Sequence, residues 1–304
     1  MVDFARRKFL KTLTAISAGS LVGRAEAPEP LVDMHQHMHY EGRTDDQLLA
    51  HQAANHVTQT VLLPGEGWML TVVGDNASCA AFEARYPQSF RRFACSDPAE
   101  SRTVDLLTGN IHRGAIGIGE LKFHVAVDSP EMHRVYKLAE ELRVPVLMHF
   151  EYETYNTGLE RFARILKAYP KVNFIGHAQT WWGNISSELN HLDLYPRGLV
   201  KPGGLTDRLL SDHENMYGDL SADSGLNALT RDAGFARGFL MRHSQKLVWG
   251  SDCACHDGRG GGTAEGYCIA ARSLAALREL VPDAKIRSQI LYKNTRKLLR
   301  LESA

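Results

Sequence analysis

The chain has 304 residues, of which 44% are hydrophobic and 23% charged. This composition excludes a disordered or fibrous protein, and the length and hydrophobic content suffice for one large core. Lysine plus arginine equals aspartate plus glutamate at 35 each, so no excess positive charge favours nucleic-acid binding. Because imidazole is the commonest neutral metal ligand, the placement of the 14 histidines carries information.

The first 27 residues contain the three parts of an export signal in order. Arg6-Arg7-Lys8-Phe9-Leu10-Lys11 resembles the twin-arginine motif, Thr12 to Gly23 forms an apolar run, and Ala25-Glu26-Ala27 has the form of a cleavage site. The run is too short and too rich in Thr, Ser and Gly to span a bilayer. We expect residues 1–27 to be a signal peptide read by the twin-arginine export machinery, and residues 28–304 to be a periplasmic or secreted domain without a stable membrane anchor.

After Pro28 the sequence alternates short apolar or β-branched runs with longer helical segments, a pattern typical of a parallel sheet built from βα units. Eight strands are predicted: Leu31–His35, Thr58–Leu63, Arg92–Cys95, Ala115–Leu121, Pro145–Phe150, Val172–Gly176, Met216–Leu220 and Leu247–Gly250. The predicted helices include Asp45–His56, Pro130–Leu142, Gly158–Tyr169, Thr206–His213, Ala264–Leu280 and Asp283–Leu298. This organisation predicts a single-domain α/β fold, a (β/α)₈ TIM barrel.

The connection between the sixth and seventh predicted strands is unusually long. Its segment Gln179–Gly204 shows no clear helical period, and long irregular loops in compact domains are usually functional or disordered. Trp181 and Trp182 in this segment either wall a substrate pocket or pack against the barrel, and the sequence leaves both alternatives open.

The end of the first predicted strand carries Asp33-Met34-His35-Gln36-His37. Side chains alternate between the two faces of a strand, so Asp33, His35 and His37 are expected to point together into the barrel. Two imidazoles placed in this way can bind one ion.

Similar groups recur at the ends of later strands. Glu120 ends the fourth strand, His149 the fifth and His177 the sixth, while Asp252 follows the eighth. The carboxyl ends of barrel strands converge on one face, where active sites are built. Four histidines and two carboxylates in this register therefore predict a metal site.

The order His-x-His, Glu, His, His, Asp resembles the amidohydrolase superfamily, specifically the amidohydrolase-related group that also includes decarboxylases and lactonases. The segment Tyr217-Gly218-Asp219-Leu220-Ser221 and the closing helix Ile290–Leu299 agree with this resemblance, which spans about Leu31 to Leu301. The motifs are specific to the superfamily but not to one substrate.

The resemblance implies a role for each site residue. His35, His37 and Asp252 would bind the first metal, and His149 and His177 would bind a second metal or help to hold the first metal or the substrate. Glu120 takes the position of the bridging ligand. The alternative bridge is a carboxylated Lys122, which otherwise pairs with Glu120 or with a substrate anion.

The implied chemistry is that of activated water. A divalent ion lowers the pKa of bound water from 15.7 to about 7. Asp252 is then the expected acceptor of the water proton, and His177 and Lys122 are the other candidate catalytic groups. Histidine and carboxylate ligands suit zinc best, with manganese and iron as alternatives, and the number of ions, one or two, is left open.

We therefore expect a metal-dependent hydrolase that acts on an amide, ester or lactone bond of a small organic substrate. The main rival is non-oxidative decarboxylation on the same scaffold, followed by phosphoester hydrolysis and by a non-catalytic metal-binding barrel. Asp252 counts against the last, because a storage site needs no proton acceptor. Homo-oligomer formation is left open.

Two glycine- and cysteine-containing segments follow Asp252. Gly258-Arg259-Gly260-Gly261-Gly262-Thr263 lies where barrels often bind phosphate, so Arg259 is a candidate substrate-binding residue, although such loops are usually only flexible. Cys253-Ala254-Cys255-His256 has no second cysteine pair at suitable spacing, which disfavours a thiolate zinc site. Most of the five cysteines are interpreted as buried small apolar residues.

Overall fold

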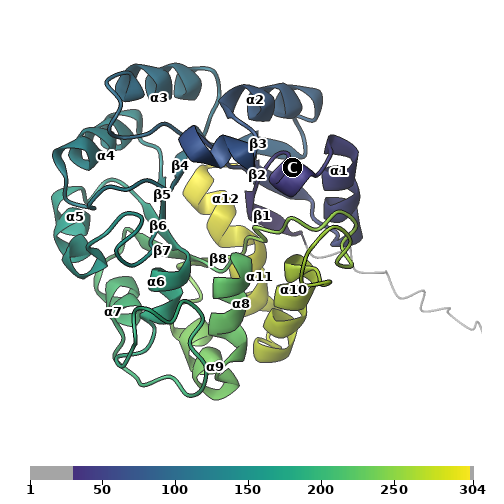
Figure 1. Cartoon of the computed structure of the whole chain (residues 1–304). Coiled ribbons are helices and arrows are strands. Elements are labelled where there is room, and N and C mark those ends of the chain that lie inside the picture. The colour runs from purple at the N-terminus through teal and green to yellow at the C-terminus, as the bar shows by residue number, and fades with distance from the viewer. Residues whose placement is uncertain (1–29, 302–304) are drawn as a thin grey trace, which may run out of the picture.

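A computed structural model describes residues 30–301, so the predicted signal peptide lies outside the described residues. Eight short parallel strands form a ring that is surrounded by helices (Figure 1). The strands are β1 (Val32–Gln36), β2 (Gln59–Leu62), β3 (Phe90–Arg92), β4 (Ile118–Leu121), β5 (Val146–His149), β6 (Phe174–His177), β7 (Met216–Asp219) and β8 (Leu247–Val248). Their order in the sheet follows their order in the chain.

Backbone hydrogen bonds close the ring at its two gaps. Between β3 and β4, the Gly119 N–H donates to the Ala94 carbonyl (2.8 Å), and between β8 and β1 the Met34 N–H donates to the Trp249 carbonyl (3.1 Å). The predicted (β/α)₈ barrel is confirmed. Strand β3 begins two residues before its predicted start, but the ladder continues through Ala94, which pairs with Ile118.

Most helices lie on the outside of the ring, between consecutive strands (Figure 1). They are α1 (Asp45–Ala54), α2 (Asn76–Arg85), α3 (Thr103–His112), α4 (Pro130–Leu142), α5 (Phe162–Ala168), α6 (Gln179–Gly183), α7 (Leu205–Asp212), α8 (Ala222–Thr230), α9 (Ala233–Arg242), α10 (Ile269–Leu280), α11 (Ala284–Ser288) and α12 (Asn294–Leu299). Local sequence signals explain their starts. Helix α1, for example, begins with a capping box formed by Thr44 and Gln47.

The core has an outer layer between strands and helices and an inner layer inside the ring. The inner layer contains apolar side chains from the strands, namely Met34, Val61, Phe93, Leu147, Ile175 and Val248. Leu298 and Leu299 of α12 pack against this layer, and α12 crosses the middle of the ring in Figure 1. The inside of the ring is therefore filled by apolar side chains.

Two of the differences from the predicted elements lie close to the candidate site. Helix α10 begins at Ile269 instead of Ala264, because the glycine-rich segment continues as a loop to its N-cap Cys268. The segment after β6 contains the short helix α6, which carries Trp181 and Trp182.

Both tryptophans lie in the core, where they are 0% and 2% exposed. The Trp181 ring stacks on Phe150, and the Trp182 indole N–H donates to the Asp219 carbonyl (2.8 Å). This placement corresponds to packing against the barrel and not to the wall of an open pocket.

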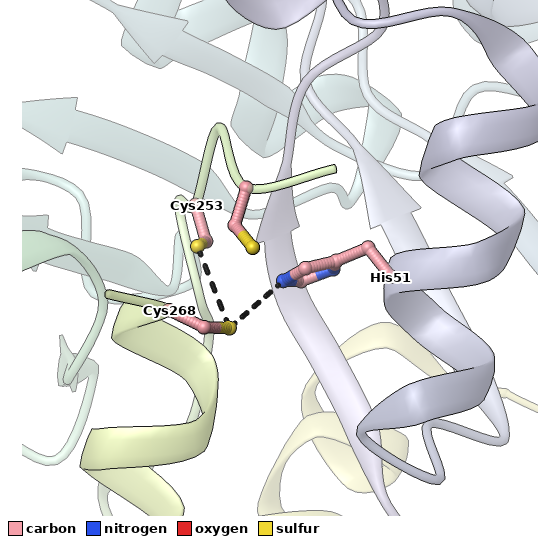
Figure 2. Close-up of side chains that lie close together, drawn as sticks. His51, Cys253 and Cys268 are labelled. Carbon is pink, nitrogen blue, oxygen red and sulfur yellow. Dashed lines mark hydrogen bonds between the residues drawn. The ribbon is translucent and has the colours of Figure 1, made fainter. Parts of the chain in front are cut away.

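All five cysteines are buried, as the sequence interpretation expects. Three of them, Cys253, Cys255 and Cys268, gather around His51 of α1 (Figure 2). This group, the Cys₃His cluster, brings together residues that are more than 200 positions apart in the chain. Among residues 30–301, none of the helices has the length and apolar character of a membrane span.

Candidate metal centre

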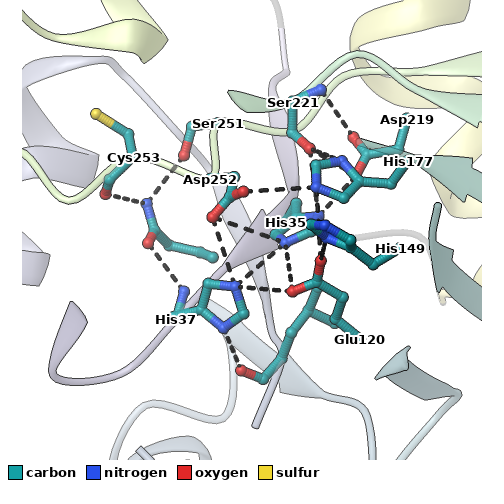
Figure 3. Close-up of polar contacts among 12 residues, drawn as sticks. His35, His37, Glu120, His149, His177, Asp219, Ser221, Ser251, Asp252 and Cys253 are labelled. Carbon is teal, nitrogen blue, oxygen red and sulfur yellow. Dashed lines mark hydrogen bonds and ion pairs between the residues drawn. The ribbon is translucent and has the colours of Figure 1, made fainter. Parts of the chain in front are cut away.

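The histidines and carboxylates predicted as ligands meet at the carboxyl ends of the strands (Figure 3). His35 and His37 come from the end of β1, Glu120 from β4, His149 from β5, His177 from β6, and Asp252 from the loop after β8. The histidines and Glu120 are buried, and Asp252 is partly buried.

His35 and His37 face each other with their Nε2 atoms 3.2 Å apart. The Nδ1 of His35 lies 2.7 Å from Asp219 Oδ2, and the Nδ1 of His37 lies 2.7 Å from the Leu63 carbonyl oxygen. Because both partners only accept hydrogen bonds, Nδ1 carries the proton in both rings. The two Nε2 atoms point at the same space, so a cation held there would bind them in place of a proton. Burial alone lowers the pKa of His35, but the charge of Asp252 and the contact with Asp219 outweigh it and raise that pKa well above its ordinary value.

The strand alternation expected for Asp33 does not hold. A register irregularity lies between Asp33 and Gln36, and the Met34 side chain points into the inner apolar layer. Asp33 instead accepts hydrogen bonds from the Ser251 N–H (2.8 Å) and from Gln52 Nε2 (3.1 Å). The irregularity thus explains why His35 and His37 share the centre and Asp33 does not.

The two predicted carboxylates belong to two donor groups that share His35: Glu120 with His35 and His37, and Asp252 with His35 and His177. Glu120 Oε2 lies 3.7 and 3.5 Å from the Nε2 atoms of His35 and His37, and Asp252 Oδ1 lies 3.8 and 3.5 Å from the same atoms. Donors about 2.1 Å from a tetrahedral ion are separated by about 3.4 Å. The Asp252 Oδ1 is buried and has no hydrogen-bond partner among the described residues, as expected for an atom that binds an ion.

His177 is oriented through a relay that starts at Asp219. The Ser221 hydroxyl donates to Asp219 Oδ2 (2.7 Å), so its oxygen accepts from His177 Nδ1 (2.9 Å). The Nε2 of His177 is left unprotonated, 3.6 Å from Asp252 Oδ2 and 3.6 Å from Glu120 Oε1. Asp219 therefore sets the tautomer of His35 directly and that of His177 through Ser221. Residues that do not touch a metal commonly orient its histidine ligands in this way.

Glu120 lies between two donor groups. Its Oε2 faces His35 and His37, whereas its Oε1 lies 2.5 Å from His149 Nδ1 and faces His177. This arrangement fits a bridging ligand. His149 also contacts Glu151 through Nε2 (3.3 Å), so both of its nitrogens face carboxylates and it supports Glu120 directly.

Burial and neighbouring charges control protonation in the centre. Burial alone raises the pKa of Glu120, but His149 outweighs it and holds that pKa well below its ordinary value. Burial, helped by the charge of His35, keeps the pKa of His177 well below the ordinary value. The charge of Asp252, followed by burial, raises the pKa of Tyr40 well above its ordinary value, so this phenol keeps its proton.

The backbone around the centre adopts conformations that non-glycine residues rarely take. Asp252 has a φ of 43°, Ala178, which follows His177, has a φ of 80°, and Ala222, which follows Ser221, has a φ of 61°. Such conformations cost about 1–3 kcal/mol each and concentrate at functional sites. The fold is therefore strained next to three residues of the centre.

Lys122 and Arg259 do not join the donor groups. The Lys122 ammonium lies over the rings of Trp68 and Tyr155, 5.2 and 5.5 Å from their centroids. The Arg259 side chain is exposed, while its N–H and that of Gly261 donate to Asp257 (2.8 and 3.0 Å). These bonds lower the pKa of Asp257 to about 2. The N–H groups of the glycine-rich loop that could bind a substrate anion therefore already bind the Asp257 carboxylate.

Sequence reasoning gave no role to several residues that shape the centre. Asp219 and Ser221 belong to the segment that agrees with the family resemblance, and their spacing at the end of β7 is that of His35 and His37 at the end of β1. Tyr40 contacts the His37 ring, with centroids 5.3 Å apart. No local signal marks Tyr40, because its approach depends on the short helical turn after β1.

The family model described as amidohydrolase matches residues 32–301. The chain belongs to the amidohydrolase family. No curated protein matches this amidohydrolase at a significant level by sequence comparison.

Solved structures share the fold of this amidohydrolase at low sequence identity. A structure described as a probable 2-pyrone-4,6-dicarboxylic acid hydrolase from Acinetobacter baumannii has a TM-score of 0.61 at 15% identity. A 2,6-dihydroxybenzoate decarboxylase from Rhizobium has a TM-score of 0.59 at 14% identity, and a 5-carboxyvanillate decarboxylase from Sphingomonas paucimobilis one of 0.57 at 12%. Each comparison covers 90% of this chain and 100% of the other. The scaffold therefore occurs in both hydrolases and decarboxylases.

Proposed function

We propose that this amidohydrolase is a metal-dependent hydrolase that cleaves an amide, ester or lactone bond in a small organic substrate. The observation that carries the proposal is the convergence of the Nε2 atoms of His35, His37 and His177 on the carboxylates of Glu120 and Asp252. A divalent ion bound there supplies a Lewis acid and lowers the pKa of water to about 7. We propose zinc as the ion, because its ligands in hydrolases are histidine and carboxylate.

Two residues are placed to handle protons and the substrate. Asp252 presents Oδ1, which has no hydrogen-bond partner among the described residues, and Oδ2, which lies 3.6 Å from His177 Nε2. This carboxylate is the proposed acceptor of the water proton and its donor to the leaving group. The phenol of Tyr40, whose proton is retained next to Asp252, is the proposed hydrogen-bond donor to the substrate oxygen.

An aromatic and cationic group at the barrel mouth suggests the substrate class. Trp68 and Tyr155 stack with centroids 5.9 Å apart, and Lys122 lies over both rings. Tyr155 also contacts the His149 ring (5.7 Å), which connects this group to the metal centre. A planar substrate that carries a carboxylate matches these contacts.

A Lys122→Gln variant is expected to keep its full metal content and to raise KM for a carboxylate-bearing substrate about 10- to 100-fold, because a charged hydrogen bond contributes about 1.5–3 kcal/mol. The exposed Lys137, replaced in the same way, serves as the control. Metal content and KM are measured on both proteins. Loss of metal in Lys122→Gln would instead support a carboxylated Lys122 as the bridging ligand.

Decarboxylation is the second candidate, because the same scaffold occurs in two decarboxylases. Zinc-loaded protein is assayed against lactones, esters, amides and aromatic acids, with acid release and carbon dioxide release followed in parallel. We expect acid release without carbon dioxide. Carbon dioxide without hydrolysis would contradict the hydrolase proposal and leave the metal centre itself intact.

A further inference from the structure

The Cys₃His cluster lies outside the proposed active site, although its first cysteine directly follows Asp252. His51 comes from α1, Cys253 from the loop after β8 and Cys268 from the N-cap of α10 (Figure 2). Cys255 belongs to the same loop as Cys253. All four side chains are buried, and their donor atoms lie within 4.8 Å of one another.

The separations fit four ligands of one tetrahedral ion. The sulfurs of Cys253 and Cys268 are 3.9 Å apart, and Cys268 Sγ is 3.4 Å from His51 Nε2. Sulfurs about 2.3 Å from a tetrahedral zinc ion are separated by about 3.8 Å. A disulfide needs about 2.05 Å, so the two sulfurs are not bonded to each other.

The His51 ring is held in the tautomer that a metal ligand needs. The Gln52 amide nitrogen donates to Asp33 Oδ2 (3.1 Å) and to Thr60 Oγ1 (2.6 Å), which turns its oxygen toward His51 Nδ1 (2.9 Å). Nδ1 is therefore the donor, and Nε2 presents its lone pair to the sulfurs. Metal-binding histidines are commonly oriented by such a bond to an amide or carboxylate oxygen.

Backbone N–H groups donate to two sulfurs of this cluster. The Gly260 N–H donates to Cys255 Sγ (3.1 Å), and the Ala271 N–H in the first turn of α10 donates to Cys268 Sγ (3.5 Å). The Cys255 thiol also contacts Asp257 Oδ1 (3.3 Å), so its proton must leave when an ion binds. A position at a helix N-terminus stabilises a thiolate.

Buried Arg43 balances the charge. Its guanidinium donates to the carbonyls of Cys253 (2.7 Å) and Cys255 (3.2 Å), and also to the His37 carbonyl (2.8 Å). Three thiolates and a divalent ion leave one negative charge, which the Arg43 cation compensates. Arg43 thus connects the cluster to the proposed active site.

We propose that His51, Cys253, Cys255 and Cys268 form a second, structural zinc site that ties the loop carrying Asp252 to α1 and α10. Four protein ligands close the site, as in structural zinc sites, and leave no position for substrate. The sequence disfavours this site because only Cys253 and Cys255 are close together in the chain. The folded barrel places His51 of α1 and Cys268 of α10 beside them. The proposal does not depend on the proposed hydrolase activity.

The site can be tested by replacing zinc with cobalt(II) in the purified protein. The proposed active site has no sulfur ligand, so thiolate-to-cobalt charge-transfer absorption reports only the Cys₃His cluster. We expect this absorption together with the bands of tetrahedral cobalt. Bound cobalt without the thiolate band would overturn the proposal.

The matched variants are Cys268→Ser and Cys79→Ser. Serine preserves the N-cap bond of α10 but is a poor zinc ligand, so Cys268→Ser should fold, lose the thiolate band and lose one equivalent of metal. Cys79 is a buried cysteine outside the cluster, and its replacement should leave both readouts unchanged. An intact thiolate band in Cys268→Ser, or a Cys253–Cys268 disulfide in the protein as purified, would contradict the site.

Discussion

A His37→Ala variant should lose the metal of the proposed active site and with it about 10³-fold or more in kcat/KM. The replacement removes one of the two Nε2 atoms that face each other and exposes the Leu63 carbonyl that orients the ring. A bound ion contributes several kcal/mol to catalysis, and each 1.36 kcal/mol corresponds to a factor of ten. Metal content and activity are measured on the same preparation.

The control is His112→Ala, which removes an exposed histidine at the end of α3. This variant should retain metal and activity. In His37→Ala the thiolate-to-cobalt band should persist, because the Cys₃His cluster is intact. Full activity in His37→Ala would refute the ligand assignment. Loss of both metals would indicate unfolding, and circular dichroism would then distinguish an unfolded protein from one that has lost only a ligand.

An Asp252→Asn variant should lower kcat about 10²- to 10⁴-fold at saturating zinc, which is the contribution typical of a general acid or base. The amide keeps the size of the side chain but cannot accept the water proton. His35, His37 and Glu120 remain, so the ion should still bind when zinc is in excess. The measurement is kcat together with metal content across a zinc titration.

Asp257→Asn provides the comparison for Asp252→Asn, because Asp257 is an exposed carboxylate in the same loop. Its loss weakens the bonds from the Arg259 and Gly261 N–H groups and from the Cys255 thiol, but it leaves the donor atoms of the proposed active site unchanged. We expect near-normal kcat in this variant. If Asp252→Asn also shows normal kcat with a full complement of metal, another group accepts the proton.

The barrel and the convergence of most candidate site residues could be predicted from the sequence because their signals are local. Each strand is a short apolar run, and His149, His177 and Glu120 lie at the ends of such runs. The convergence of strand ends then follows from the fold class alone. The largest difference in a boundary lies before α10, where a loop replaces the expected helix start.

The parts that could not be predicted depend on tertiary contacts. The irregularity in β1 turns Asp33 away from His35, and no sequence pattern marks it. Asp219 acts on His35 across the barrel, and its role appears only when strands β1 and β7 meet in space. The same holds for the Cys₃His cluster, in which α1 and α10 supply the two ligands that the adjacent cysteine pair lacks.

The most direct test of the metal centre is a crystal structure of the zinc-loaded protein with anomalous data collected at the zinc edge. The proposed centre predicts a strong anomalous peak bounded by His35, His37, Glu120 and Asp252. A second peak among Cys253, Cys255, Cys268 and His51 would independently support the structural site. The absence of any peak beside His35 and His37 in zinc-loaded crystals would contradict the metal-dependent mechanism proposed for this amidohydrolase.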